Sequence, residues 1–130
     1  MRAASGVARA KRRLRRSPAL PGVVGRWFIA WLEPPVRPAL KKKAPVIIRP
    51  RPAPPLADAL ASFLLSQEEV RAYVLEVADL DLAHVTFVNP FVHGVRFSLA
   101  TGLHVIAAHE RRHLWQAWNV RRSIETAAAA

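Results

Sequence analysis

The placement of proline is the feature that most constrains this chain. Ten of its eleven prolines precede residue 56, and eight of them fall between Glu33 and Leu56. Proline removes a backbone donor and clashes with the preceding helical turn, so no helix can run through that stretch and extended geometry is expected. The chain is therefore expected to divide near Pro55. A body of roughly seventy residues remains after it, near the lower limit for an independent core.

Charge divides the chain at the same place. The net charge is +11, and residues 1–51 carry fourteen Lys and Arg against the single acid Glu33, whereas residues 52–130 carry six against eight. We expect residues 1–22 to form a basic disordered leader, because so few apolar side chains cannot offset the entropy of ordering. The alternatives are an arm that binds nucleic acid or an anionic surface, an organelle transit peptide, and the product of a misplaced start.

Residues 23–55 are predicted to hold a short helix followed by a proline-rich linker. The helix, Val23–Leu32, is expected to bury four large side chains against the body: Trp27, Phe28, Trp31 and Leu32. It is too short to span a bilayer and contains Arg26, and no other segment is apolar enough. The absence of cysteine excludes a disulfide framework and a thiolate metal site. We expect a cytoplasmic protein.

Residues 56–126 are predicted to form a helical body. Its first helix, 57–78, has Asp58 in its first turn, where a carboxylate is favoured. The expected apolar face contains Leu60, Phe63, Leu64, Val70, Val74 and Val77. Ser66 to Glu69 also resembles a capping box, which leaves a break as the alternative to one continuous helix. Residues 79–98 are predicted to be loop with at most a short local strand pairing, and His84 and His93 are interpreted as ordinary loop histidines.

The last predicted helix, 98–123, carries the residues of greatest chemical interest. At about 100° per residue, one face holds Gly102, Val105, Ile106, His109, His113, Gln116, Ala117 and Val120. The side with Leu103, Leu114 and Trp118 is also apolar, so we expect the helix to be covered on two sides. The expected exposed strip contains Thr101, His104, Arg111, Arg112 and Asn119. Two histidines four residues apart project toward a common point, as a divalent metal requires.

The histidine pair admits other interpretations. His109–His113 has the HExxH spelling of zinc proteases, with Glu110 as general base, but both intervening residues are arginine and no convincing third ligand follows. The pair could instead be core histidines whose nitrogens are satisfied by neighbours, of which Gln116 is the first to consider. Glu110 is interpreted as a surface acid that pairs with arginine.

The run from Ser98 to Ala117, with HERRHLWQA at its centre, resembles the last helix of the DinB-like family of bacillithiol-transferase-like bundles. The segment Leu32–Arg37 and the Asn89–Phe91 turn are similar to one branch of that family, so the resemblance covers roughly residues 30–122. It implies an all-α fold: a partial up-and-down four-helix bundle with a long C-terminal helix after a proline-rich basic segment.

The resemblance also implies a divalent metal, zinc or nickel, held by three histidines, of which His109 and His113 would be two. The implied activity is a thiol transferase or a metal-dependent hydrolase acting on a small-molecule thiol or an unknown substrate, and a homodimer is one option. The sequence leaves open whether this chain is an enzyme or a remnant that is inactive through loss of the N-terminal helices. The competing function is a basic protein that binds nucleic acid or an anionic surface through its N-terminal arm.

The third histidine of the family lies on an earlier helix. This sequence has no histidine before His84, and residues 1–32 leave no room for two long helices. We therefore expect a family member truncated at its N-terminus, with less than one metal per chain. His84, His93, Asp79, Asp81 or a second chain are the candidates to complete the site.

Overall fold

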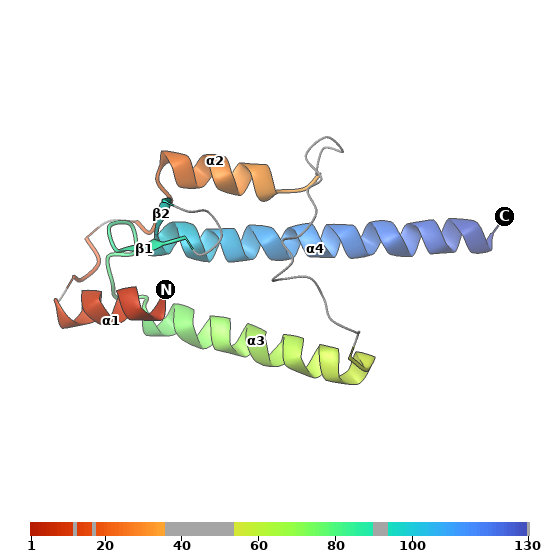
Figure 1. Ribbon diagram of the computed structural model, residues 1–130, viewed down its shortest axis with the longest axis horizontal. Coiled ribbons are helices and arrows are strands. Elements are labelled where there is room, and N and C mark those ends of the chain that lie inside the picture. The colour runs from red at the N-terminus through yellow and green to blue at the C-terminus, as the bar shows by residue number, and fades with distance from the viewer. Residues whose placement is uncertain (12, 17, 36–53, 90–93, 130) are drawn as a thin grey trace.

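The computed structural model describes residues 1–11, 13–16, 18–35, 54–89 and 94–129. Within these residues the elements are α1 (Arg2–Ala10), α2 (Val23–Leu32), α3 (Leu56–Glu76), β1 (Thr86–Val88), β2 (Arg96–Ser98) and α4 (Leu99–Ala128). The predicted all-α fold with a long C-terminal helix is confirmed. Figure 1 shows α2 on one side of α4 and α3 on the other. Most of the predicted proline-rich linker, residues 36–53, lies outside the described residues.

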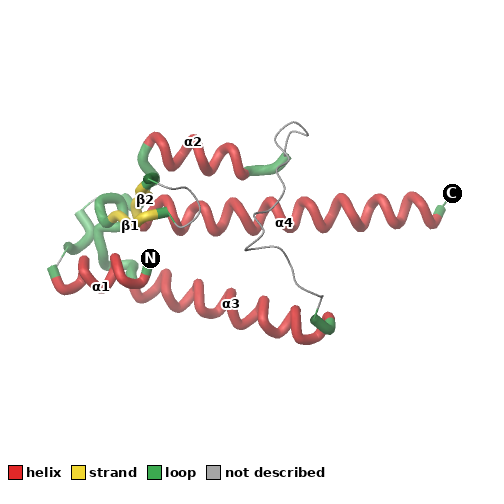
Figure 2. The backbone as a smooth tube through the Cα atoms, viewed as in Figure 1, coloured by secondary structure: helices red, strands yellow, loops and turns green. Residues whose placement is uncertain are grey.

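The helix α4 begins where the short hairpin ends. The backbone amide of Thr101 donates to the Ser98 hydroxyl at 3.1 Å, an N-cap that fixes the first turn. Just before it, β1 and β2 pair antiparallel with Phe87 opposite Phe97 (Figure 2). Each strand has three residues, so the prediction of a short local pairing at most is confirmed for the described part of the chain.

The core lies around the first turn of α4. Leu99 and Ala100 pack there with Tyr73 and Val77 near the end of α3, and with Leu80, Leu82 and Val85 of the loop that follows. The loop is tied to α4 through its backbone, because the amides of Leu99 and Ala100 donate to the carbonyls of Val85 and Leu82 at 2.7 and 2.9 Å. Within the described residues, most of the buried core therefore lies around the N-terminal end of α4.

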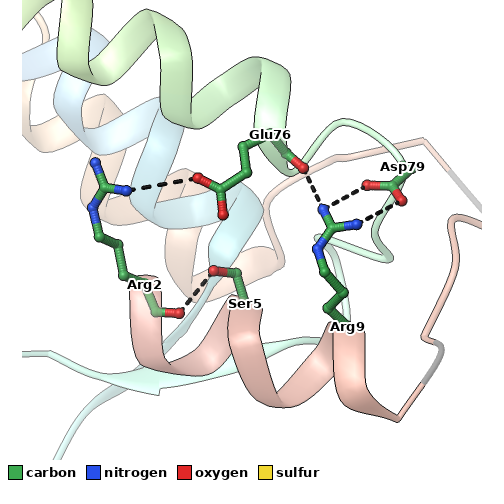
Figure 3. A network of polar contacts seen from close by, with 5 residues as sticks. All are labelled: Arg2, Ser5, Arg9, Glu76 and Asp79. Carbon is green, nitrogen blue, oxygen red and sulfur yellow. Dashed lines mark hydrogen bonds and ion pairs between the residues drawn. The ribbon is translucent and has the colours of Figure 1, made fainter.

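The expectation of a disordered leader is wrong for Arg2–Ala10, which form α1. Ala8 is 2% exposed and belongs to the core. Arg9 donates to both carboxylate oxygens of Asp79 at 3.2 and 3.3 Å and to the Glu76 carbonyl, and Arg2 lies 3.6 Å from the Glu76 carboxylate (Figure 3). The prediction failed because a small side chain on one face and ion pairs to a distant acidic turn supply contacts that composition does not reveal.

The helix α2 packs closely on α4 and corrects two expectations. Gly25 is buried, and a Cβ atom built there would lie 2.4 Å from the Thr101 hydroxyl. Thr101, expected in the exposed strip of α4, is 2% exposed because its side chain packs against Gly25, whereas His104 and Arg111 of that strip are exposed as expected. Leu32 is buried as expected, but Trp27 is 69% exposed on the outer side of α2.

The far halves of α3 and α4 are not covered by the described residues. Of the predicted apolar face of α3, Leu60, Phe63, Leu64 and Val74 are exposed, whereas Val77, the residue after the last turn, is buried. On α4, Leu114 and Trp118 are also exposed, so the expectation that this helix is covered on two sides is wrong. The cause is geometric, because α3 diverges from α4 away from the core (Figure 1). Among the described helices, none combines the length and apolar character that crossing a bilayer requires.

Candidate metal centre

His109 and His113 lie on successive turns of α4 and face each other. Their Nε2 atoms are 2.9 Å apart, and the two rings meet edge to face with centroids 4.4 Å apart. Both side chains are exposed rather than buried within an apolar stripe, which corrects the sequence-based expectation. The sequence predicted the convergence because residues i and i+4 share a helix face. It did not predict that both side chains are exposed. Within the described residues, no other element covers this face of α4 at the two histidines.

Gln116 orders the pair. Its side-chain oxygen lies 3.0 Å from Nδ1 of His113, and because a carbonyl oxygen only accepts, Nδ1 carries the proton. In the neutral ring Nε2 of His113 is then an acceptor, so Nε2 of His109 donates to it. Gln116 was the neighbour named from the sequence, and this prediction is confirmed.

The pKa of His109 is lowered from its usual value of 6.5. Partial burial has the largest effect, and positive charge on His113 and Arg112 adds to it, while Glu110 opposes it. His109 is therefore held in its neutral form, which is the form that binds metals.

The other residues of the HERRH run hold neighbouring helices. Gln67 on α3 donates to the Glu110 carboxylate at 2.9 Å, and none of the described arginines forms an ion pair with Glu110, contrary to the expectation. Arg111 instead pairs with Glu33 at the end of α2, and its Nε donates to both carboxylate oxygens at 3.1 Å. This contact lowers the pKa of Glu33 and raises that of Arg111. Arg112 lies over the ring of Trp31, 5.8 Å from its centroid.

The roles of Glu33 and Gln67 were missed from the sequence. Glu33 is the only acid among residues 1–51, and this isolation was a signal that it could form an ion pair with a distant arginine. Gln67 lies within the suspected capping box. Because that interpretation involves only neighbouring residues, it did not predict the contact of Gln67 with Glu110 on another helix. One four-residue spacing thus serves two purposes, since the histidines project from one face while the residues between them connect α4 to α2 and α3.

The candidates for a third ligand are not brought to the pair. His84 lies 3.0 Å from the Asp81 carboxylate, and Asp79 accepts from Arg9, so these groups have partners of their own. His93 lies outside the described residues. Across the part of the chain that the structure describes, no three His, Cys, Asp or Glu side chains gather closely enough to hold a metal ion. Two nitrogen ligands are therefore what the described chain offers.

The described elements define a helical-bundle protein whose longest helix carries an exposed histidine pair. A comparison with known protein families matches residues 8–117 to the DinB superfamily. The match spans most of the 130 residues, and the chain belongs to this superfamily. It includes the end of α1 and all of α2, a longer stretch than the sequence resemblance covered. Comparison with curated proteins and with solved structures gives no significant match.

Proposed function

We propose that this chain binds a divalent metal ion, zinc or nickel, through Nε2 of His109 and Nε2 of His113. The observation that supports the proposal is the convergence of the two atoms at 2.9 Å. Two nitrogens at about 2.0–2.1 Å from a tetrahedral zinc ion are about 3.3 Å apart, so the rings need to separate by only a few tenths of an ångström. The donor set fits the first two positions of such a site.

The contacts around the pair suit this role. The Gln116 oxygen keeps the proton of His113 on Nδ1, which leaves Nε2 with a free lone pair, the arrangement usual around metal-binding histidines. The lowered pKa of His109 keeps its ring neutral at pH 7. Binding requires His109 to move its proton from Nε2 to Nδ1, which a neutral imidazole can do through water.

The chemistry we infer is a thiol transfer or a hydrolysis on a small molecule. A bound metal with open positions supplies Lewis acidity, which lowers the pKa of a thiol or of water so that its anion is available at neutral pH. The chain's own contribution is to hold two nitrogens on a rigid helix and to leave the remaining positions open. Glu110 is held by Gln67 on the neighbouring helix, so we do not assign it the role of general base.

A metal titration tests this proposal. We expect the wild type to bind zinc weakly, with less than one ion per chain after purification, because two ligands are half of a tetrahedral shell. The double variant His109→Ala/His113→Ala should lose this binding. His104→Ala is the matched control, since His104 is an exposed histidine on the same helix away from the pair. Identical binding in the wild type and the double variant would contradict the proposal, and tight one-to-one binding would contradict its claim of an incomplete site.

The competing function, a basic arm that binds nucleic acid or an anionic surface, has less support. Arg2 and Arg9 of that arm are paired with Glu76 and Asp79 of the same chain. The arm in the described residues is therefore partly neutralised and attached to the body, which leaves fewer charges to release counterions from a polyanion.

A further inference from the structure

An apolar hollow lies against α4, about one helical turn before the histidine pair. Three phenylalanines from three elements line it, Phe28 of α2, Phe87 of β1 and Phe97 of β2, and α4 closes it with Val105 and Ile106. Phe28 and Phe97 stack in a tilted arrangement with ring centroids 5.2 Å apart. Its volume is about 380 Å³, within the range of small-molecule sites, and its exposed lining is almost entirely apolar.

Gly102 allows this hollow to form. A Cβ atom built there would lie 2.9 Å from two carbons of the Phe87 ring and 3.0 Å from the end of Met1. The absence of a side chain therefore lets the Phe87 ring lie directly against α4. The close approach of the β1–β2 hairpin to α4 therefore forms this wall of the hollow, rather than one long side chain. Both elements pack against the core, so the core fixes the shape of the wall.

The hollow and the histidines lie on the same stripe of α4. Val105 and Ile106 precede His109 by four and three residues, about one helical turn, so the hollow lies on the order of 5 Å along the axis from the pair. A molecule seated in the hollow would extend its polar end toward His109. An apolar hollow near two nitrogens that are proposed to bind a metal is the arrangement expected when one part of a substrate is bound for affinity and another part reacts.

We propose that the hollow binds the apolar part of the substrate, an aromatic group of one or two rings or an aliphatic group of similar size. A cavity of about 150 Å³ accommodates benzene, so 380 Å³ is large enough for two fused rings. Because the lining is Phe-rich and apolar except for Asn89, a sugar or a free phosphate would lose its water for few hydrogen bonds. That this group belongs to a substrate rests on the proposed function, since the reacting end would meet a metal held by His109 and His113.

The first experiment tests the hollow alone. The probe is 2-naphthol, titrated into the metal-free protein and followed by its fluorescence and by saturation-transfer NMR. Val105→Phe should fill the hollow and weaken binding by about tenfold or more, since even one methylene in an apolar pocket changes affinity by that order. Val120→Phe is the matched control, because Val120 lies on the same face of α4 but is 58% exposed and far from the hollow. Circular dichroism confirms that both variants fold.

A second variant keeps the inference open to refutation if Val105→Phe unfolds the protein. Val105→Ala enlarges the hollow without adding bulk, and it should retain 2-naphthol binding and improve binding of a larger three-ring probe, 2-anthrol. Equal 2-naphthol affinity in the wild type, Val105→Phe and Val120→Phe would overturn the inference. An unchanged preference between the two probes in Val105→Ala would overturn it as well.

The second experiment separates the hollow from the metal. With zinc present, 2-naphthalenethiol should bind the wild type more tightly than 2-naphthol does, and His109→Ala/His113→Ala should remove that difference while keeping 2-naphthol binding. If the wild type binds 2-naphthalenethiol and 2-naphthol equally tightly in the presence of zinc, the proposed function and the assignment of a substrate are contradicted. The hollow would then still be a binding site for an apolar group. Absence of naphthol binding contradicts the inference even where zinc still binds.

Discussion

The contact between Gly25 and Thr101 positions α2 against α4. The end of α2 in turn contacts Arg111 and Arg112 of α4. Thr101 is 2% exposed, and its hydroxyl lies 2.9 Å from that of Ser98, so its side chain cannot rotate away without disturbing the N-cap of α4. A Cβ atom at residue 25 would lie 2.4 Å from the Thr101 hydroxyl and 2.7 Å from its methyl group. The substitution Gly25→Ala must therefore push α2 away from α4.

The magnitude follows from two opposing effects. Alanine in a helix interior is favoured over glycine by about 0.5–1 kcal/mol. Overpacking of a close contact costs about 1–3 kcal/mol. Gly25→Ala is therefore expected to be between neutral and about 2.5 kcal/mol destabilising. The clash should dominate because the contact is to a fixed, β-branched side chain.

Gly6→Ala is the matched control, because Gly6 also lies inside a helix but no heavy atom lies within 4 Å of its added Cβ. This variant should be stabilised by about 0.5–1 kcal/mol through the propensity gain alone. Urea unfolding followed by circular dichroism gives both free energies of unfolding, and the two variants should differ by about 1–3 kcal/mol. Equal stabilisation of the two variants would refute the close packing of α2 on α4.

Three further predictions follow from the ion pairs and the histidines. Because contact with Arg111 lowers the pKa of Glu33 below 4.5, this pair contributes stability at pH values above 4.5, and that stability is lost as the pH falls through the lowered pKa. In urea unfolding measured across pH, the free energy of unfolding of Glu33→Gln should not show this decrease. In metal-free protein, His109 should titrate below 6.5 by NMR, and His113→Gln should raise its midpoint only partly, because burial has the larger effect. Deletion of residues 2–10 should lower the free energy of unfolding, since Ala8 lies in the core, whereas an unchanged value would support a solvated leader.

The sequence predicted those parts of the fold that depend on local pattern. The bounds of α2 were predicted correctly, the bounds of α3 were predicted to within two residues, and each strand within the described residues has only three residues, as expected. The convergence of His109 and His113 and the role of Gln116 followed from helical spacing alone. Each of these rests on residues close together in the chain.

Features that depend on distant contacts were not predicted. The order of α1 comes from Arg9 meeting Asp79, seventy residues away, and from Ala8 entering a core built by later segments. Arg111 is exposed as expected, but its ion pair with Glu33 was not predicted, because Glu33 lies at the end of another helix. The exposure of Phe63 and Leu114 reflects the divergence of α3 from α4, which no apolar periodicity encodes.

The most direct test of the proposed metal centre observes the four ring nitrogens of His109 and His113 individually. Long-range ¹H–¹⁵N NMR spectra recorded during a zinc titration distinguish a metal-bound nitrogen from a protonated one. We predict that Nε2 of both histidines shifts to the metal-bound range while Nδ1 of His113 remains protonated toward Gln116, with His84 and His104 unchanged. A titration in which zinc moves His84 or His104 and leaves the His109–His113 pair hydrogen-bonded would contradict the proposed centre.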